Sequence, residues 1–230
     1  MFELPGAKFY LVGGCVRDQL LGRPIKDRDY VVLTEMSFEE LATAMEQAGA
    51  TIFVRKPEFL TIRARYKDEV FDVAFPRVDG EYKDGRRPVS VSLADSLEQD
   101  AKRRDFTINA MYLGDDGKVI DFFDGKRDLG AKLINTVGEP ADRFKEDYLR
   151  ILRAVRFSCV LSFGIDYFTF GAMHELSGGL RRISADRIRE ELNKSLLADP
   201  ALTFHMLKTL EVFDILKEKG ITFETTLRDR

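Results

Sequence analysis

The stretch "YLVGGCVRDQLLGRPIKDRDYVV", residues 10–32, determines the fold that we expect for this chain. An apolar run ends at the glycine pair Gly13 and Gly14, and the short helical segment that follows stops at Gly22. A second apolar run then begins behind two aspartates. The order strand, helix, strand predicts a domain in which helices pack on a β-sheet.

The two aspartates, Asp27 and Asp29, are spaced two residues apart. On a strand this spacing directs both side chains to one face while Arg28 points to the other. Carboxylates that lie so close raise each other's pKa unless a cation lies between them, and Mg²⁺ prefers oxygen ligands of this kind. The alternative is an exposed turn whose aspartates face water, and the spacing alone leaves both interpretations open.

Three features near this pair favour the metal site. Asp72 lies inside the apolar stretch "VFDVAFPR", where an unpaired charge is costly. The glycine pair allows backbone N–H groups to approach an anion, and Arg17 adds charged donors. Three acids around two metal ions, beside a site for phosphate, are typical of nucleotidyl transfer.

Length, charge and cysteine content narrow the class of protein. The 230 residues suffice for one large domain or for one and a half smaller ones. A net charge of −3 provides no general attraction to nucleic acid, so such contacts require local clusters. Cys15 and Cys159 lack metal spacing and are expected to be buried free thiols, while His174 and His205 are expected to be ordinary surface or packing residues. No signal segment or membrane-spanning run is found, which predicts a cytoplasmic protein with no membrane partner.

The remaining pattern predicts a head with strands and helices, followed by a part that is entirely helical. Residues 37–49 form a helix with Ser37 as N-cap and Glu40 in a capping box. The expected strands, helices and loop of the first half are, in order, strand 8–14, strand 28–33, β-rich stretches 51–54, 59–66 and 69–75, a polar loop 76–92, a helix running into a strand over 93–113, and a strand and turn over 119–125. From about residue 136 the periodicity is helical.

Four stretches, taken together, resemble a known family. They are the opening stretch, "DAKRRDFTINAMYL", "EDYLRILRAVRF" and "ISADRIREEL". In this order they are similar to the successive motifs of the bacterial-type (class II) tRNA nucleotidyltransferase and poly(A) polymerase family, over about residues 8–197. The resemblance implies an α+β fold with a polymerase-beta-like nucleotidyltransferase head and a small mixed sheet (1–135), an all-helical neck with a nucleotide-selecting helix (136–200), and the start of a truncated helical body (201–230).

The resemblance also implies roles for individual residues. Asp27, Asp29 and Asp72 are expected to be catalytic and to hold two Mg²⁺ ions. The residues expected to bind the nucleotide are Gly13, Gly14, Arg17, Arg103, Arg104, Asp105, Asn109, Asp147, Arg150 and Arg153. On their own, the two arginines of "KRRD" fit a solvated helix end and Asn109 fits a cap.

The stretch 146–157 read as one helix has two sides. The inward side comprises Tyr148, Ile151, Leu152, Val155 and Cys159, and the opposite side comprises Glu146, Asp147, Arg150 and Arg153. A solvated face with ion pairs is the simple interpretation. The resemblance implies instead that Asp147 and Arg150 read the base, because an acceptor beside a donor matches cytosine and adenine and leaves guanine and uracil with unpaired groups.

A second helix, in 183–194, is expected to brace the first. Its packing stripe comprises Ile188, Leu192 and Leu196. Arg187 and Arg189 are expected to face solvent and to play supporting roles only.

The activity that the resemblance implies is template-independent addition of C and/or A from CTP/ATP to a tRNA 3′ end or another RNA, with release of pyrophosphate. CCA, CC or A addition, a poly(A) polymerase, and a silent nucleotide- or RNA-binding module all remain open. Lys83, Arg86 and Arg87 in the loop 76–92 either close over substrate or belong to a plain connector. Family members continue beyond the neck, so we expect either a shortened chain or a compact form in which a homodimer or partner chain supplies the missing tRNA contacts.

Overall fold

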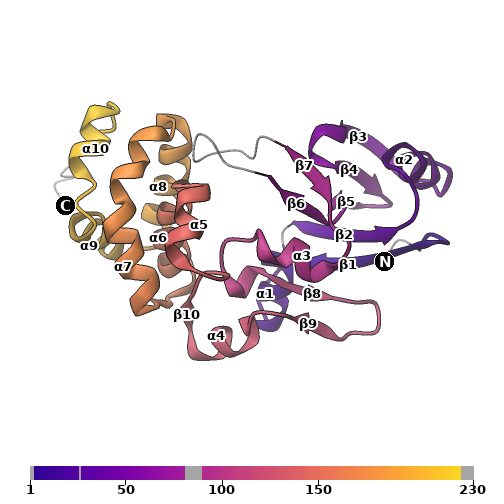
Figure 1. Cartoon of the computed structure of the whole chain (residues 1–230), viewed down its shortest axis with the longest axis horizontal. Helices are drawn as coiled ribbons and strands as arrows, with labels where there is room; N and C mark the ends of the chain where they lie inside the picture. Colours follow the sequence, from indigo (N-terminus) through magenta and orange to yellow (C-terminus); the bar gives the residue numbers. More distant parts are fainter. Residues whose placement is uncertain (1–2, 26, 81–89, 224–230) are drawn as a thin grey trace, which may run out of the picture. The chain divides into compact units, whose positions relative to one another are not determined.

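The computed structural model describes residues 3–25, 27–80 and 90–223, which form two compact units (Figure 1). The first unit extends to residue 138 apart from residues 132–134, and the second contains 132–134 and the residues from 139 onward. A mixed sheet with helices characterises the first unit and helices dominate the second, which confirms the predicted α+β class. The predicted limits of head, neck and body stay predictions.

Strands of the first unit form one large sheet. In the described part of the chain, its seven members lie in the order β3-β4-β5-β2-β1-β8-β9. Their bounds are β1 (Ala7–Val12), β2 (Arg28–Thr34), β3 (Thr51–Lys56), β4 (Thr61–Tyr66), β5 (Glu69–Ala74), β8 (Met111–Leu113) and β9 (Val119–Asp121). The pair β2 and β5 is parallel and the other neighbours are antiparallel. A parallel pair thus lies at the centre of the sheet.

The described helices of the first unit lie in predicted helical segments, except the one over residues 125–131, which was not predicted. They are α1 (Gly14–Leu20), α2 (Phe38–Gln47), α3 (Leu97–Lys102) and α4 (Gly125–Ala131), with 3₁₀ turns η1 (Pro57–Phe59) and η2 (Thr107–Asn109). The capping box of α2 is confirmed, because Glu40 N–H donates to Ser37 Oγ at 3.3 Å and Ser37 N–H donates to the Glu40 carboxylate at 2.8 Å. Helix α2 packs against β3.

The predicted loop 76–92 is wrong at both ends. Strands β6 (Arg77–Asp79) and β7 (Val91–Leu93) pair there as a small antiparallel sheet. The pairing satisfies the backbone hydrogen bonds of residues whose polar composition gave no strand pattern. Lys83, Arg86 and Arg87 lie outside the described residues.

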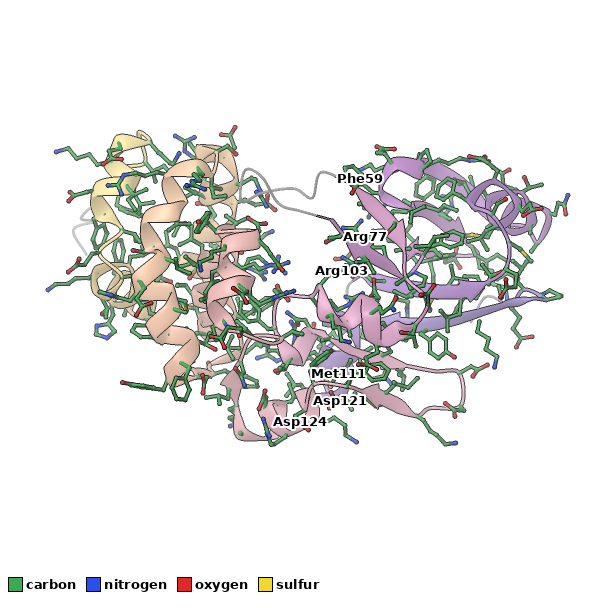
Figure 2. All side chains as sticks on the ribbon, in the orientation of Figure 1. Phe59, Arg77, Arg103, Met111, Asp121 and Asp124 are labelled. Carbon is green, nitrogen blue, oxygen red and sulfur yellow. The ribbon has the colours of Figure 1, made fainter. Side chains whose placement is uncertain are left out.

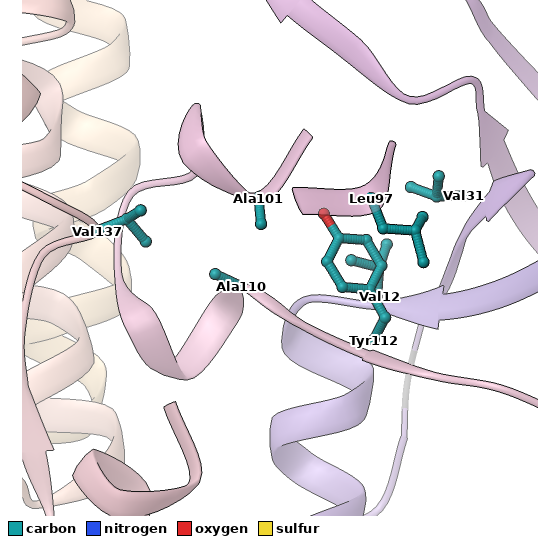
Figure 3. Packing of buried hydrophobic residues seen from close by; sticks show 7 residues of the cluster. All are labelled: Val12, Val31, Leu97, Ala101, Ala110, Tyr112 and Val137. Atoms are coloured by element: carbon teal, nitrogen blue, oxygen red, sulfur yellow. The ribbon is translucent and has the colours of Figure 1, made fainter. Parts of the chain in front are cut away.

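Helix α3 covers one face of the main sheet beside β1, β2 and β8. The buried cluster at this contact comprises Val12, Val31, Leu97, Ala101, Ala110, Tyr112 and Val137 (Figure 3). Full burial of one such large side chain stabilises the fold by about 1.5–3 kcal/mol. Because α3 is fixed on this cluster, the residues that directly follow it, Arg103 and Arg104, are held close to the ends of β1 and β2.

The second unit consists of helices and one short parallel sheet. The strands are β10 (Leu133–Ile134) and β11 (Gly164–Ile165). The helices are α5 (Pro140–Glu146), α6 (Leu149–Leu161), α7 (Tyr167–Leu176), α8 (Ala185–Ala198), α9 (Pro200–Thr209) and α10 (Phe213–Glu218), with the 3₁₀ helix η3 (Ser177–Arg182). Helix α6 packs against α8 and α9, as the bracing role predicts for α8. Of the helices in the described residues, none combines the length and apolarity needed to cross a membrane.

The predicted single helix across 146–157 is interrupted at Asp147. This residue has an extended backbone, with φ −146° and ψ 105°, and its side chain accepts a hydrogen bond from Leu149 N–H at 3.0 Å. The side chain therefore serves the start of α6 instead of lying within a helix. Arg150 is buried, which argues against the simple interpretation of a solvated face, and its predicted role in reading the base stays a prediction. Ile151 and Leu152 are buried as predicted.

The isolated thiols and imidazoles are where the sequence places them. Cys15 and Cys159 are both free and buried. His174 and His205 are exposed.

Candidate active site

Two of the three predicted carboxylates lie side by side at the centre of the sheet. Asp29 in β2 and Asp72 in β5 are register partners across the parallel pair. Residues at matching register on neighbouring strands direct their side chains to the same face. Asp27 is exposed and lies one residue before the start of β2.

Both aspartates line a pocket of about 370 Å³ in the first unit. Its lining residues are Val12, Asp29, Tyr30, Val31, Val54, Lys56, Thr61, Arg63, Asp72, Ala74 and Arg104. Two carboxylates and three cationic side chains thus meet in one open cavity. Such a mixture suits a ligand that carries both phosphate groups and metal ions.

The surroundings of the pocket raise the pKa values of both of its aspartates. Partial removal from water raises the pKa of Asp29, and the charge of Asp72 raises it further, while Arg104 opposes the shift. The pKa of Asp72 is also raised by loss of hydration and by the charge of Asp27, against the effect of Arg63, whose Nη1 lies 3.7 Å from Asp72 Oδ2. Loss of hydration, together with repulsion between the acids, therefore outweighs the effect of the nearby cations and disfavours the ionised form of both carboxylates.

The acids fit a divalent cation by chemistry. They offer oxygen ligands on neighbouring strands, and a bound cation would relieve the repulsion that raises both pKa values. In the described residues, no group of three or more acidic, histidine or cysteine side chains is close enough to hold a metal ion as the side chains lie. The structure thus brings together Asp29 and Asp72 of the predicted metal site. The charge of Asp27 raises the pKa of both.

Arg104 is held in the pocket by a buried acid that the sequence reasoning missed, Asp100. The Asp100 carboxylate has no exposed surface and accepts from Arg103 Nε at 2.8 Å, Arg104 Nη2 at 2.9 Å and Tyr112 Oη at 2.7 Å. Burial alone raises the pKa of Asp100, but the charges of Arg104 and Arg103 and the hydroxyl of Tyr112 hold it at about 2. Asp100 lies three and four residues before the two arginines, which is the helical spacing of ion pairs and the signal that could have revealed it.

A further contact ties this network to β6. Arg77 N–H donates to Asp100 Oδ1 at 3.2 Å, and Arg77 Nη1 donates to the Phe59 carbonyl at 3.1 Å. Figure 2 labels Phe59, Arg77 and Arg103 along this side of the first unit. The buried acid therefore joins three segments that are distant in the sequence.

At Gly13 the backbone lies close to the Arg104 guanidinium. The Gly13 φ of +79° favours glycine, and the Gly13 N–H donates to the carbonyl of Met111 at 3.2 Å. Met111 is labelled in Figure 2. A Cβ atom at Gly13 would lie 3.4 Å from Arg104 Nη1, in van der Waals contact with the guanidinium. The positive φ is therefore what requires glycine here, and Arg104 lies directly beside it.

Three more predicted nucleotide-binding residues form a buried chain. Arg17 Nη1 donates to Asn109 Oδ1 at 2.7 Å, and Asn109 Nδ2 donates to Asp105 Oδ1 at 3.2 Å. Arg17 also pairs with Asp18 at 2.9 Å. The structure therefore brings Arg17, Asn109 and Asp105 together through side chains that hold one another in place, and their binding of nucleotide stays a prediction.

The predicted base-selecting residues lie in the second unit. Asp147 Oδ2 accepts from Arg187 Nη2 at 2.9 Å, while Arg150 Nη1 pairs with Glu146 at 2.5 Å and donates to the Arg143 carbonyl at 3.0 Å. Arg187 is half-buried and fixes the carboxylate, which is more than the solvent-facing, supporting role predicted for it.

Arg153, one turn further along α6 than Arg150, stands over the ring of Phe157, with 5.5 Å between Cζ and the ring centroid. The aromatic ring therefore supports this guanidinium.

Comparison with known families agrees with this geometry. Residues 9–135 match the model described as "Poly A polymerase head domain". The chain belongs to the poly(A) polymerase head-domain family. Residues 162–220 match a second model, described as "Probable RNA and SrmB- binding site of polymerase A".

Curated relatives in the poly(A) polymerase head-domain family carry the name CCA-adding enzyme. The enzyme of Bacillus subtilis (strain 168) is 42% identical over 191 residues, which are 83% of this chain and 47% of the relative. That of Streptococcus suis (strain 05ZYH33) is 39% identical over 194 residues, 84% of this chain and 47% of the relative. The chain spans about half the length of the curated relatives that it matches.

Solved structures show the same fold. The Bacillus stearothermophilus CCA-adding enzyme in complex with CTP has a TM-score of 0.76 and 33% identity, covering 94% of this chain and 49% of that one. The Thermotoga maritima CCA-adding enzyme complexed with tRNA_CCA has a TM-score of 0.77 and 30% identity, covering 95% and 50%. The predicted nucleotidyltransferase fold is therefore confirmed.

Proposed function

We propose that this chain adds nucleotides to the 3′ end of RNA, using CTP and/or ATP and releasing pyrophosphate. The observation that carries the proposal is the register pairing of Asp29 and Asp72 in one pocket with Arg104. The family supports it, because relatives over most of this chain are named CCA-adding enzymes. We infer that the acceptor is tRNA lacking part of its 3′ terminus.

In the proposed reaction the RNA 3′-hydroxyl attacks the α-phosphorus of the nucleotide. A bond forms between the 3′ oxygen and this phosphorus, and the bond to the pyrophosphate oxygen breaks. Asp29 and Asp72, with Asp27, would hold Mg²⁺, which supplies a lower pKa for the attacking hydroxyl and neutralises charge on the triphosphate. Arg104, fixed by Asp100, binds a phosphate oxygen, and the backbone at Gly13 and Gly14 lets the triphosphate approach β1.

The other residues of the first unit are assigned to the sugar and phosphates. Arg17 and Arg103 supply guanidinium donors, while Asp105 and Asn109 accept from ribose hydroxyls and so favour ribonucleotides. In the second unit, Asp147 accepts from the exocyclic amine of cytosine or adenine, and Arg150 donates to the adjacent ring nitrogen. Arg153, on the same helix, is assigned to the nucleotide as a further guanidinium donor.

A poly(A) polymerase is the second candidate. The description of the matching head-domain model favours it, because the model carries that enzyme's name. The two activities require the same chemistry and the same carboxylates, so they differ in acceptor and in the length of the product.

Incubating the chain with tRNA that lacks its 3′ CCA, with Mg²⁺ and with each labelled nucleoside triphosphate in turn tests the proposal. Addition of CC, CCA or a single A supports the tRNA activity, and long A tracts support the polymerase. Absence of incorporation from every nucleotide contradicts both and leaves a binding module. Arg150→Ala, with Lys194→Ala on the solvent side of α8 as the control, should relax the choice of base if Arg150 reads it.

A further inference from the structure

The pocket face of the sheet continues past the carboxylates onto β4 and β3. Arg63 in β4 is the register partner of Asp72 on one side and of Val54 in β3 on the other. Thr61 and Lys56 form the next pair along the same two strands. All of these residues line the pocket, so β4 and β3 extend its floor away from β2.

This extension is cationic. Lys56, Arg63 and Arg65 are all exposed. Ile62 and Ala64, which alternate with the two arginines along β4, are buried, so both arginines point to the pocket side. Arg63 has Asp72 as its acidic neighbour. Among the described residues, neither Lys56 nor Arg65 has an ion pair or a side-chain hydrogen bond within the usual distance limits, although the charge of Lys56 lowers the pKa of Asp72.

The opposite face of the same strands differs. Arg55, between Val54 and Lys56, pairs with Glu39 at 3.2 Å and with Glu46 at 2.8 Å, both on α2. The protein therefore neutralises the cation on the α2 side with two acids, whereas on the pocket side Lys56 and Arg65 are exposed and Arg63 has Asp72 at 3.7 Å. Such an asymmetry favours an anionic ligand on the pocket side.

The sheet order indicates which anion this is. The residues assigned to the triphosphate, at Gly13, Arg17 and Arg104, lie on β1 and the segments beside it, on one side of β2. Strands β4 and β3 lie on the other side, beyond β5. Because the attacking and leaving oxygens are roughly in line across the α-phosphorus, the RNA should enter on the side away from the triphosphate.

We propose that Lys56, Arg63 and Arg65 form the binding surface for phosphodiester groups at the 3′ end of the RNA acceptor. The inference rests on the proposed function and adds to it the surface along which the RNA acceptor strand binds. Flexible lysine and arginine side chains bind phosphates without reading sequence, which suits an acceptor end whose last nucleotides change as addition proceeds.

The test compares the double variant Lys56→Gln/Arg65→Gln with Arg55→Gln/Lys118→Gln. Both remove two positive charges, and Lys118 lies in the turn between β8 and β9, paired with Asp116 at 3.3 Å. Binding of a fluorescent RNA hairpin with a single-stranded 3′ end is measured by anisotropy over a salt series, and binding of CTP by calorimetry. Circular dichroism confirms that each variant is folded.

We expect the first double variant to bind RNA on the order of fivefold more weakly, with the salt slope reduced by about 1 to 1.5, because about 0.7 is lost for each phosphate contact to single strands. CTP binding should not change, and the control should match the wild type. Unchanged RNA binding, weaker CTP binding instead, or no RNA binding by the wild type would each overturn the proposal. Absence of nucleotide incorporation by a wild type that binds RNA through these residues would reject the proposed function and leave this surface standing.

Discussion

Asp100 connects the hydrophobic core of the first unit to its pocket. The carboxylate is fully buried, and its partners Arg104 and Tyr112 belong to the pocket and to the core cluster, respectively. A buried charge of this kind is tolerated only when its partners remain in place. The same residue therefore contributes to stability and positions a guanidinium for phosphate.

Replacing Asp100 with Asn should lower the free energy of unfolding at pH 7 by about 2 kcal/mol. The reason is that folding lowers the pKa of Asp100 to about 2, so the ionised carboxylate stabilises the folded state. A lowered pKa in the folded state means that this stabilisation is present above about pH 4 and is lost as pH falls toward 2. Urea unfolding at several pH values measures it, with Asp115→Asn at an exposed turn position as control. Equal stability of wild type and Asp100→Asn at pH 7 would contradict the assignment.

Asp29 has the opposite effect on stability. Loss of hydration and the charge of Asp72 raise its pKa, so the ionised form is disfavoured in the folded state. The unfolded chain then binds fewer protons than the folded chain between the two pKa values, and stability falls as pH rises through this window. The fold thus tolerates a cost at this position for the sake of the pocket.

Asp29→Asn should therefore abolish nucleotide transfer. At pH 7 without added metal, the same substitution should raise Tm by roughly 1–3 °C, a modest increase because solvent screens the charge of an exposed side chain. Mg²⁺ should raise the Tm of the wild type and of the Asp68→Asn control, but not that of Asp29→Asn. Scanning calorimetry with and without Mg²⁺ provides the measurement. Retained transfer by the variant would remove the assignment of Asp29.

At the scale of the elements, periodicity predicted what local patterns can encode. Helix α2 with its capping box, the β-rich stretches that form β4 and β5, and the strand that carries Asp29 all follow from apolar spacing and cap residues. The pairing of β6 with β7 and the break before α6 did not follow. Both depend on partners distant in sequence or on a side chain bonding to backbone, which a periodic pattern does not contain.

The same limit applies to the site. Acids and arginines were identified by type and spacing, and the resemblance gave them roles. The place of Arg63 beside Asp72 follows only from the register of β4 with β5. The ion pair between Arg187 and Asp147 likewise follows only from the packing of α8 on α6. Contacts across elements are what a single sequence reveals least.

Arg187→Gln should loosen the Asp147 carboxylate at the start of α6. We expect the ratio of correct to incorrect nucleotide incorporation, CTP or ATP against UTP or GTP, to fall on the order of tenfold, the effect of one charge-assisted hydrogen bond. Single-turnover incorporation of each nucleotide measures the ratio. Arg189→Gln on the same helix, where the arginine is exposed, serves as the control, and an equal loss in both variants would refute a specific hold on Asp147.

The molecule as a whole has no excess of positive charge, and it spans about half the length of its curated relatives. Attraction to RNA must then come from local groups such as those on β3 and β4. Few phosphate contacts imply modest affinity that salt weakens steadily.

For the wild type we expect the slope of log K against log salt to lie between about −1.5 and −3, as for two to four phosphates contacted on a single strand. Anisotropy titrations from low to physiological salt measure it. A slope near zero would show that RNA is held by groups other than these cations.

The register of β2 with β5 has one more consequence. A shift of either strand by a single residue would carry one acid to the α2 side of the sheet, because successive side chains alternate. Molecules with misaligned strands would then be inert instead of slow. The specific activity of a refolded sample should therefore be proportional to the fraction of molecules in which the two strands are correctly aligned. A one-residue insertion within β5 should abolish nucleotide transfer, whereas the same insertion in the turn at Asp115 should leave transfer unchanged.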